Sequence, residues 1–166
     1  MMRRALGFVV GLLAASCAPH DGPCGNGTCV CPVDGSCDIP CAAPPCHLDC
    51  QEGSSCSGEC ANGDCTCRAS ASCTFACAAP PCHVNCEGDN PQCDGSCANG
   101  ECACGPNSSC AFTCDAPPCH ARCEAGSSCT LTCPSSANGD CNIVTCDTEV
   151  VICDDGLVNA CGTPCP

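Results

Sequence analysis

The segment Cys60-Ala-Asn-Gly-Asp-Cys65-Thr-Cys67 decides how the whole chain is interpreted. It returns 37 residues later as Cys97-Ala-Asn-Gly-Glu-Cys102-Ala-Cys104, and an earlier copy reads Cys24-Gly-Asn-Gly-Thr-Cys29-Val-Cys31. A second motif, Cys-x-x-Pro-Pro-Cys-His, alternates with it and begins at Cys41, Cys77 and Cys114. Self-similarity at a fixed period of this length is the signature of a repeat architecture.

The repeats divide the chain into units of about 37 residues. Three units with eight cysteines each occupy residues 25–61, 62–98 and 99–137, and residues 18–24 precede them as a short linker. A degenerate copy at 138–166 has Ile143 where the second cysteine of the Cys-x-Cys pair would stand. Because deviant terminal copies are expected where an array needs a cap, we predict that this last copy is a capping repeat.

Inside the units, nine windows follow the pattern Cys-x-Φ-x-Cys, in which Φ is apolar or Gly. Strict alternation of this kind predicts a short strand whose two cysteines and central residue face inward. The high content of Gly and Pro argues against helices. The windows begin at Cys37, Cys46, Cys56, Cys73, Cys82, Cys93, Cys110, Cys119 and Cys129.

The links between these windows alternate between four residues and five or six. All short turns would then lie along one edge of the molecule and all longer ones along the other. We therefore predict a small, disulfide-rich, all-β fold with little helix, built as an antiparallel meander or as a narrow β-solenoid. The Asn-Gly pairs at 26–27, 62–63, 99–100 and 138–139 favour a two-residue type I′ hairpin turn.

Spacing also restricts the disulfides. Two cysteines four residues apart on a strand are separated by about 13 Å, because a strand rises ~3.3 Å per residue. A disulfide needs Cα atoms about 4.4–6.8 Å apart, so each cysteine must pair with one on another strand. The cysteines that flank an Asn-Gly turn face each other, which predicts the bridges Cys24–Cys29, Cys60–Cys65 and Cys97–Cys102. The Pro-Pro links have equal length and predict Cys41–Cys46, Cys77–Cys82 and Cys114–Cys119.

The composition gives the same view of the fold. Of 166 residues, 31 are Cys, 17 Gly and 15 Pro, whereas Trp and Tyr are absent and Phe occurs three times. So few large apolar side chains cannot build a conventional core, and cysteine at this level marks a disulfide scaffold. These numbers argue against a doubly wound α/β enzyme, a helical bundle and a coiled coil. Disulfides are expected to take over the stabilising role of the missing apolar core.

The first 16 residues predict an export signal. Arg3 and Arg4 give a positive start, and residues 5–16 are mostly apolar but too few to span a bilayer. The run Leu13-Ala-Ala-Ser-Cys17 resembles the lipobox of bacterial lipoproteins. That resemblance implies a lipid on Cys17 and an outer-membrane or other cell-envelope location. Ordinary cleavage after Ser16, which would give a secreted protein, is the alternative.

Charge narrows the possible partners. Loss of Arg3 and Arg4 with the signal would leave two basic residues against 18 acidic ones, a net charge of −16. Such a surface repels phosphate backbones, so we expect no nucleic-acid partner. The expected partners are the membrane, through the lipid on Cys17, and an extracellular protein or glycan of unknown identity.

Three resemblances suggest other functions. The Cys-x-Asn-Gly-x-Cys-x-Cys segments are similar to part of an EGF-like module, where such a run forms a hairpin, which implies a binding role. Cys-x4-Cys-His resembles a lengthened c-type haem attachment motif, which implies His47, His83 and His120 as axial ligands. The Cys-x-Cys clusters resemble metallothionein, which implies a thiol-based metal-binding protein.

Enzymatic motifs are missing from the sequence. It contains no phosphate-cradling Gly loop, no Gly-x-Ser-x-Gly and no His-Glu-x-x-His. We therefore predict a structural or adhesive surface protein without a catalytic role. We expect no catalytic, cofactor-binding or metal-binding residues.

Overall fold

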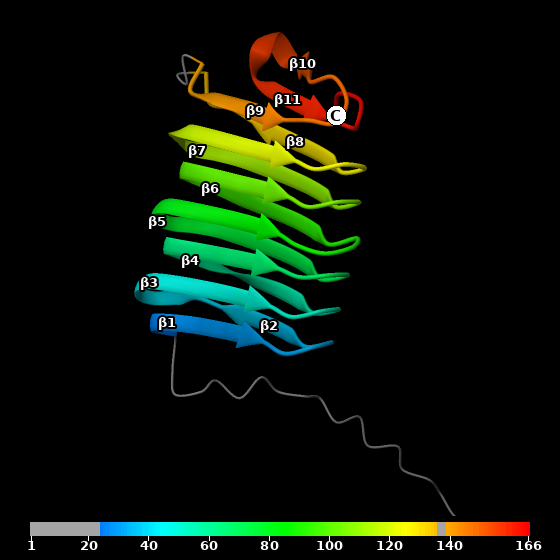
Figure 1. Ribbon diagram of the computed structural model, residues 1–166. Coiled ribbons are helices and arrows are strands. Elements are labelled where there is room, and N and C mark those ends of the chain that lie inside the picture. The colour runs from blue at the N-terminus through cyan, green and yellow to red at the C-terminus, as the bar shows by residue number, and fades with distance from the viewer. Residues whose placement is uncertain (1–23, 136–138) are drawn as a thin grey trace, which may run out of the picture.

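The computed structural model describes residues 24–135 and 139–166, with only the backbone described at 24–26, 42 and 155 (Figure 1). The described chain is almost entirely β-structure, with no α-helix and one short 3-10 helix, η1 (Asp154–Gly156). The strands are β1 (Cys24–Cys31), β2 (Ser36–Ile39), β3 (Cys41–Cys50), β4 (Ser55–Cys67), β5 (Ser72–Cys86), β6 (Gln92–Cys104), β7 (Ser109–Cys123), β8 (Ser128–Thr132), β9 (Cys141–Thr145), β10 (Val151–Cys153) and β11 (Val158–Cys161).

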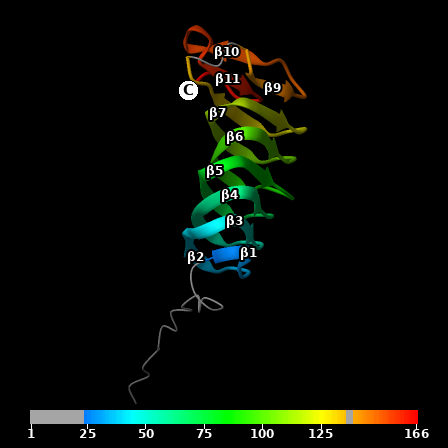
Figure 2. The ribbon, with the colours of Figure 1, turned by 90° about the vertical axis from the view of Figure 1, so that its left-hand side faces the viewer.

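The strands stack in parallel as a narrow β-solenoid of about six turns. From β3 to β7 each strand pairs in parallel with the next, and β1 pairs with β3 and β2 with β4 in the same way. Figure 2, turned by 90° from Figure 1, shows the same coils as a thin stack. The fold is therefore the solenoid, and not the antiparallel meander that the sequence also allowed.

Each 37-residue repeat contains two coils. Residues at equivalent places on successive coils are Ser36, Ser55, Ser72, Gln92, Ser109 and Ser128, so that the coils hold 19, 17, 20, 17 and 19 residues. A coil with an Asn-Gly corner alternates with a coil whose corner holds Pro-Pro, and the Pro-Pro peptide bonds at 44–45, 80–81 and 117–118 are cis. The four-residue links form one edge of the stack, and the longer loops form the other (Figure 1).

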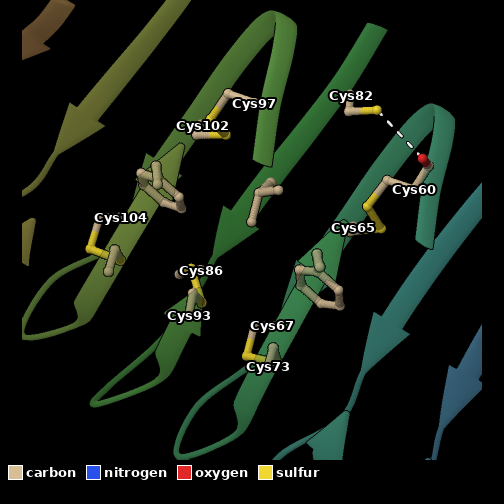
Figure 3. Packing of buried hydrophobic residues seen from close by; sticks show 14 of the residues in the cluster. Cys60, Cys65, Cys67, Cys73, Cys82, Cys86, Cys93, Cys97, Cys102 and Cys104 are labelled. Carbon is tan, nitrogen blue, oxygen red and sulfur yellow. Dashed lines mark hydrogen bonds between the residues drawn. A yellow bond between two sulfur atoms is a disulfide. The ribbon is translucent and has the colours of Figure 1, made fainter. Parts of the chain in front are cut away.

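The interior is narrow and is filled mostly by sulfur (Figure 3). Cysteines on both layers are buried, and other residues lie between them on each layer: Leu48, Val84 and Ala121 on one, and a row that includes Phe75 and Phe112 on the other. Bulky side chains alternate with glycine from coil to coil in this row, because Ile39, Gly58, Phe75, Gly95 and Phe112 are successive register partners. The predicted inward face of Cys, apolar residue and Cys is confirmed by the burial along β5 and β7.

The C-terminal segment closes one end of the stack with a different arrangement. Strand β9 adds in parallel to β7, whereas β11 pairs antiparallel with β8 and β10 pairs antiparallel with β11. The parallel stacking therefore ends at β8 and β9. In Figure 1 this segment lies at the end of the stack opposite β1.

The prediction of type I′ hairpins at the Asn-Gly pairs is wrong for the corners at 62–63 and 99–100. A type I′ turn requires positive φ at both central residues. Here Asn62 and Asn99 have φ of 47° and 49°, but Gly63 and Gly100 are not in the left-handed region. The strands on either side of the corner form their backbone pairs with neighbouring coils, so that the corner joins two layers of a solenoid.

Candidate functional site

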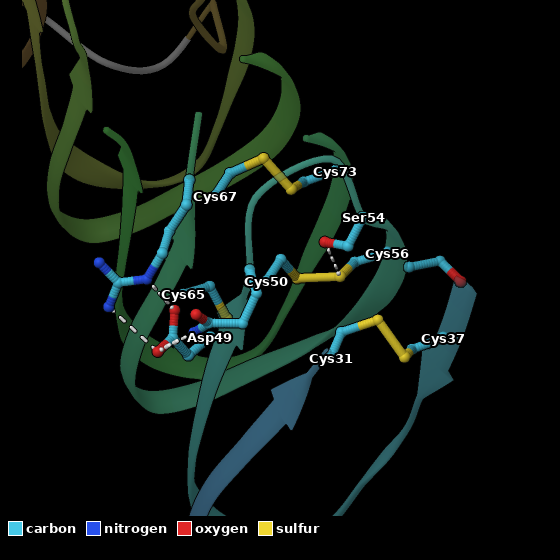
Figure 4. The surroundings of a disulfide bond; sticks show 12 residues. Cys31, Cys37, Asp49, Cys50, Ser54, Cys56, Cys65, Cys67 and Cys73 are labelled. Carbon is cyan, nitrogen blue, oxygen red and sulfur yellow. Dashed lines mark hydrogen bonds and ion pairs between the residues drawn. A yellow bond between two sulfur atoms is a disulfide. The ribbon is translucent and has the colours of Figure 1, made fainter. Parts of the chain in front are cut away.

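Two columns of disulfides run along the stack, one at each edge. The loop column closes each coil across its longer loop, with Cα–Cα distances of 5.9–6.4 Å (Figure 4). Its half-cystines are buried, none exposing more than 8% of its surface. The bridges of the loop column are Cys31–Cys37, Cys50–Cys56, Cys67–Cys73, Cys86–Cys93, Cys104–Cys110 and Cys123–Cys129.

The corner column closes each coil across its four-residue link. Its bridges include five of the pairs that the equal link lengths predict, namely Cys41–Cys46, Cys60–Cys65, Cys77–Cys82, Cys97–Cys102 and Cys114–Cys119. Cys133–Cys141 continues the column at its end. For the sixth predicted pair, Cys29 is disulfide-bonded, but the side chain of Cys24 lies outside the described residues. The predicted lipid site, Cys17, lies outside them as well.

The spacing of the repeats could not predict the bridges of the cap. Cys146–Cys161 and Cys153–Cys165 join cysteines 15 and 12 residues apart, much farther than in the stack. These two pairs could not be predicted because the degenerate copy at 138–166 does not keep the cysteine spacing of the three full repeats. The loop column, in contrast, follows from pairing consecutive cysteines across the longer links once a solenoid is assumed.

The sulfur atoms gather closely at two points of the loop column. The Sγ atoms of Cys50, Cys56 and Cys73 all lie within 4.8 Å of one another, and so do those of Cys86, Cys93 and Cys110. All six residues are disulfide-bonded, as is every other cysteine whose side chain is described. They therefore supply no thiolate to a soft metal and no thiol for haem attachment.

The histidines of the Pro-Pro-Cys-His motif tie neighbouring coils together at the corner edge. His47 Nδ1 accepts a hydrogen bond from the Asp64 N–H at 3.1 Å, and His83 Nδ1 accepts one from the Glu101 N–H at the same distance. Each ring packs over the glycine of the next Asn-Gly corner, where a Cβ at Gly63 would lie 2.9 Å from His47 Nδ1. Sequence reasoning missed this role because it depends on the register between two coils.

Charged side chains also connect coils on the outside. Arg68 donates from Nε and Nη2 to the two carboxylate oxygens of Asp49, at 2.7 and 3.0 Å (Figure 4). The hydrogen bond to Asp49 and the attraction of its charge raise the pKa of Arg68, and Glu87 adds a smaller attraction. Arg122, on β7, likewise places Nε and Nη2 against the carboxylate of Glu101 on β6. Exposed pairs of this type add at most about 1 kcal/mol each.

One layer presents a polar, regularly spaced outer face. One outward column consists of Ser36, Ser55, Ser72, Gln92, Ser109 and Ser128. The residues two positions further along each strand form a second outward column, Asp38, Ser57, Thr74, Asp94, Ala111 and Thr130. Two shallow grooves cross this face between the columns. Because neighbouring strands lie ~4.8 Å apart, the hydroxyl and carboxylate groups of this face are spaced at multiples of that distance, interrupted by Gln92 in the first column and by Ala111 in the second.

The density of disulfides indicates an oxidising, extracellular or exported environment, since cytosolic thiols are kept reduced. Within the described ranges, none of the helical structure is long and apolar enough to serve as a membrane span. No protein-family model, curated protein or solved structure matches the chain. The Asn-Gly segments that resemble an EGF-like hairpin form solenoid corners at 60–67 and 97–104. The disulfide columns and the polar face are thus the features that suggest a function.

Proposed function

We propose that the chain is an exported structural or adhesive surface protein, anchored by a lipid on Cys17 and without a catalytic role. The observation that carries this proposal is the closure of each successive coil by disulfides at both edges. A bridge over a six-residue loop contributes about 2 kcal/mol in the chain-entropy estimate. A stack closed in this way stays rigid without a large apolar core, which suits a passive element exposed to proteases.

The direction of the stack supports the anchoring. The predicted lipid site at Cys17 is seven residues from the start of β1, which is at most about 25 Å of extended chain. The coils would therefore begin close to the membrane surface. Because the cap lies at the other end of the stack, it would be held away from the membrane (Figure 1).

The outer face supports a surface role. It carries hydroxyl and carboxylate side chains in register, including Asp38, whose Oδ1 accepts a hydrogen bond from Ser57 Oγ at 2.8 Å. Hydroxyl and carboxylate groups bind extracellular proteins and glycans through hydrogen bonds. The proposal makes this face the adhesive surface.

Fractionation of bacterial cells that express the full chain tests the anchoring. We expect the wild-type protein in the membrane fraction, with the mass of a lipid-modified N-terminal cysteine, and the Cys17→Ser variant released from the membrane. His20→Ala, three residues further on, is the matched control and should stay with the membrane. A wild-type protein that is free of lipid and found in the soluble fraction would refute the anchoring.

A further inference from the structure

Neighbouring bridges of the loop column lie directly above one another. Cys50 is the register partner of Cys67, and Cys56 is the register partner of Cys73. The bridges Cys50–Cys56 and Cys67–Cys73 and these two register pairs therefore form the four sides of a square. A second square has the bridges Cys86–Cys93 and Cys104–Cys110 as two sides, with the register pairs Cys86/Cys104 and Cys93/Cys110 as the others.

The sulfur positions bring reacting atoms together across each square. Cys73 Sγ lies within 4.8 Å of both sulfurs of the Cys50–Cys56 bridge, and Cys110 Sγ lies equally near the Cys86–Cys93 bridge. Register partners on adjacent strands have Cα atoms ~4.8 Å apart. This distance falls in the range of about 4.4–6.8 Å that a disulfide needs. The Cα spacing between coils therefore meets the Cα requirement of a disulfide.

The corner column has this arrangement at only one end of its bridges. Cys60 faces Cys77 and Cys97 faces Cys114, but the second cysteines of the corner bridges are out of register. At the corners the register shifts, so that Cys46 faces Ala61 while Cys65 faces Leu48. Cys65 is thus displaced by two residues from the position opposite Cys46, and their Cα atoms are about 8 Å apart. The two columns therefore differ in the register of their second cysteines. Within the described residues, the two sulfur clusters also lie only in the loop column, although both columns consist of disulfide-bonded cysteines.

We propose that the two sulfur clusters, Cys50/Cys56/Cys73 and Cys86/Cys93/Cys110, are thiol–disulfide exchange sites. At each, a small-molecule thiol converts two bridges that close single coils into two bridges that link neighbouring coils. The thiol comes from outside, because every cysteine whose side chain is described is disulfide-bonded. Cys50 and Cys73 expose 0% and 2% of their surface, so that the exchange requires a local opening of the fold.

The exchange balances without net oxidation or reduction. The external thiolate attacks Cys50 Sγ, so that a mixed disulfide forms at Cys50 and Cys56 leaves as a thiolate. Cys56 then attacks Cys73 Sγ, the Cys56–Cys73 bond forms, and Cys67 leaves as a thiolate. Finally Cys67 attacks the mixed disulfide at Cys50, which forms Cys50–Cys67 and releases the external thiolate. The thiol is therefore a catalyst, and the number of disulfides is unchanged.

The two isomers differ in what they hold together. Bridges within a coil leave neighbouring coils joined by the continuous chain, by backbone and side-chain hydrogen bonds, by ion pairs and by packing. Bridges between coils add covalent links along the axis of the stack. The exchange thus replaces the closure of single coils by cross-links between neighbouring coils.

Disulfide mapping of the full-length protein tests the proposal. The folded protein is incubated with a monothiol at neutral pH, quenched with an alkylating agent, digested and analysed by mass spectrometry. We expect peptides linked through Cys56–Cys73 and Cys93–Cys110, with none linked between corner positions Cys46 and Cys65. Recovery of the original pairs alone, after the same incubation, would overturn the proposal.

A pair of double variants tests the geometry without the thiol. Cys50→Ser with Cys67→Ser leaves Cys56 and Cys73, which we expect to form a bridge on air oxidation and to lose all reactivity toward the alkylating agent. The matched control, Cys41→Ser with Cys60→Ser, leaves Cys46 and Cys65, which should both remain alkylated. Free thiols in the first variant, or a bridge in both, would overturn the proposal.

Discussion

Gly58 lies against the side chain of Leu48 in the neighbouring coil. A Cβ atom at position 58 would lie 2.5 Å from Leu48 Cδ1 and 2.8 Å from the carbonyl oxygen of Ile39. The side chains of the larger coil thus occupy the space that the glycine leaves in the smaller one. This complementarity explains why the sequence repeats every two coils rather than every coil.

Gly58→Ala should therefore destabilise the protein by about 1–3 kcal/mol, the usual cost of overpacking a core. Gly95→Ala should cost less, because its Cβ would lie 3.2 Å from Val84 Cγ2. Gly27→Ala is the matched control, since a Cβ there meets nothing within 4 Å. The urea midpoint of each variant measures the effect. Equal midpoints for Gly58→Ala and Gly27→Ala would contradict the packing described.

His83→Ala should weaken the contact between two coils. It removes the acceptor of the part-buried Glu101 N–H, at a cost of about 1 kcal/mol. Amide hydrogen exchange at Glu101 should accelerate, because this N–H loses its protein partner. His120→Ala is the control, because Nδ1 of His120 contacts the side-chain oxygen of Asn142 instead of the Glu101 N–H. Unchanged exchange at Glu101 would show that the histidine does not hold the coils together.

The loss of stability on removing a single bridge should increase with the length of the loop that the bridge closes. The Cys60–Cys65 bridge spans five residues in sequence, and the Cys146–Cys161 bridge of the cap spans 15. The chain-entropy estimate is about 2 kcal/mol for the first and about 3 kcal/mol for the second. Paired Cys→Ser variants compared by urea unfolding measure both losses. A larger loss for the Cys60–Cys65 bridge than for the Cys146–Cys161 bridge would contradict the dependence on loop length.

The strands, the solenoid alternative and the corner cysteine pairs could be predicted from the sequence because each has a local signal. Alternation in windows such as Cys73-Thr-Phe-Ala-Cys77 shows which side chains face inward, whatever the strand pairs with. The equal length of the Asn-Gly and Pro-Pro links places Cys60 opposite Cys65 and Cys77 opposite Cys82 in either topology.

What the sequence could not provide was the register between coils. Asn62-Gly63 gives a strong hairpin signal, but that signal does not reveal whether the flanking strands pair with each other or with the next coil. The hydrogen bond from the Glu101 N–H to His83 and the alignment of Cys56 with Cys73 both depend on that register. Each joins residues 17 or 18 positions apart, beyond the range of a local pattern.

The central claim is that disulfides replace the apolar core, and reduction without denaturant tests it most directly. The purified protein is treated with a strong phosphine reductant, alkylated, and compared by circular dichroism and protease digestion with a sample alkylated without reductant. We predict that the reduced protein loses its β-sheet signal and is digested rapidly. The unreduced sample should resist digestion and should not be alkylated at Cys29 or at any later cysteine. A reduced and fully alkylated protein that keeps its β-sheet signal and its resistance to protease would contradict the claim.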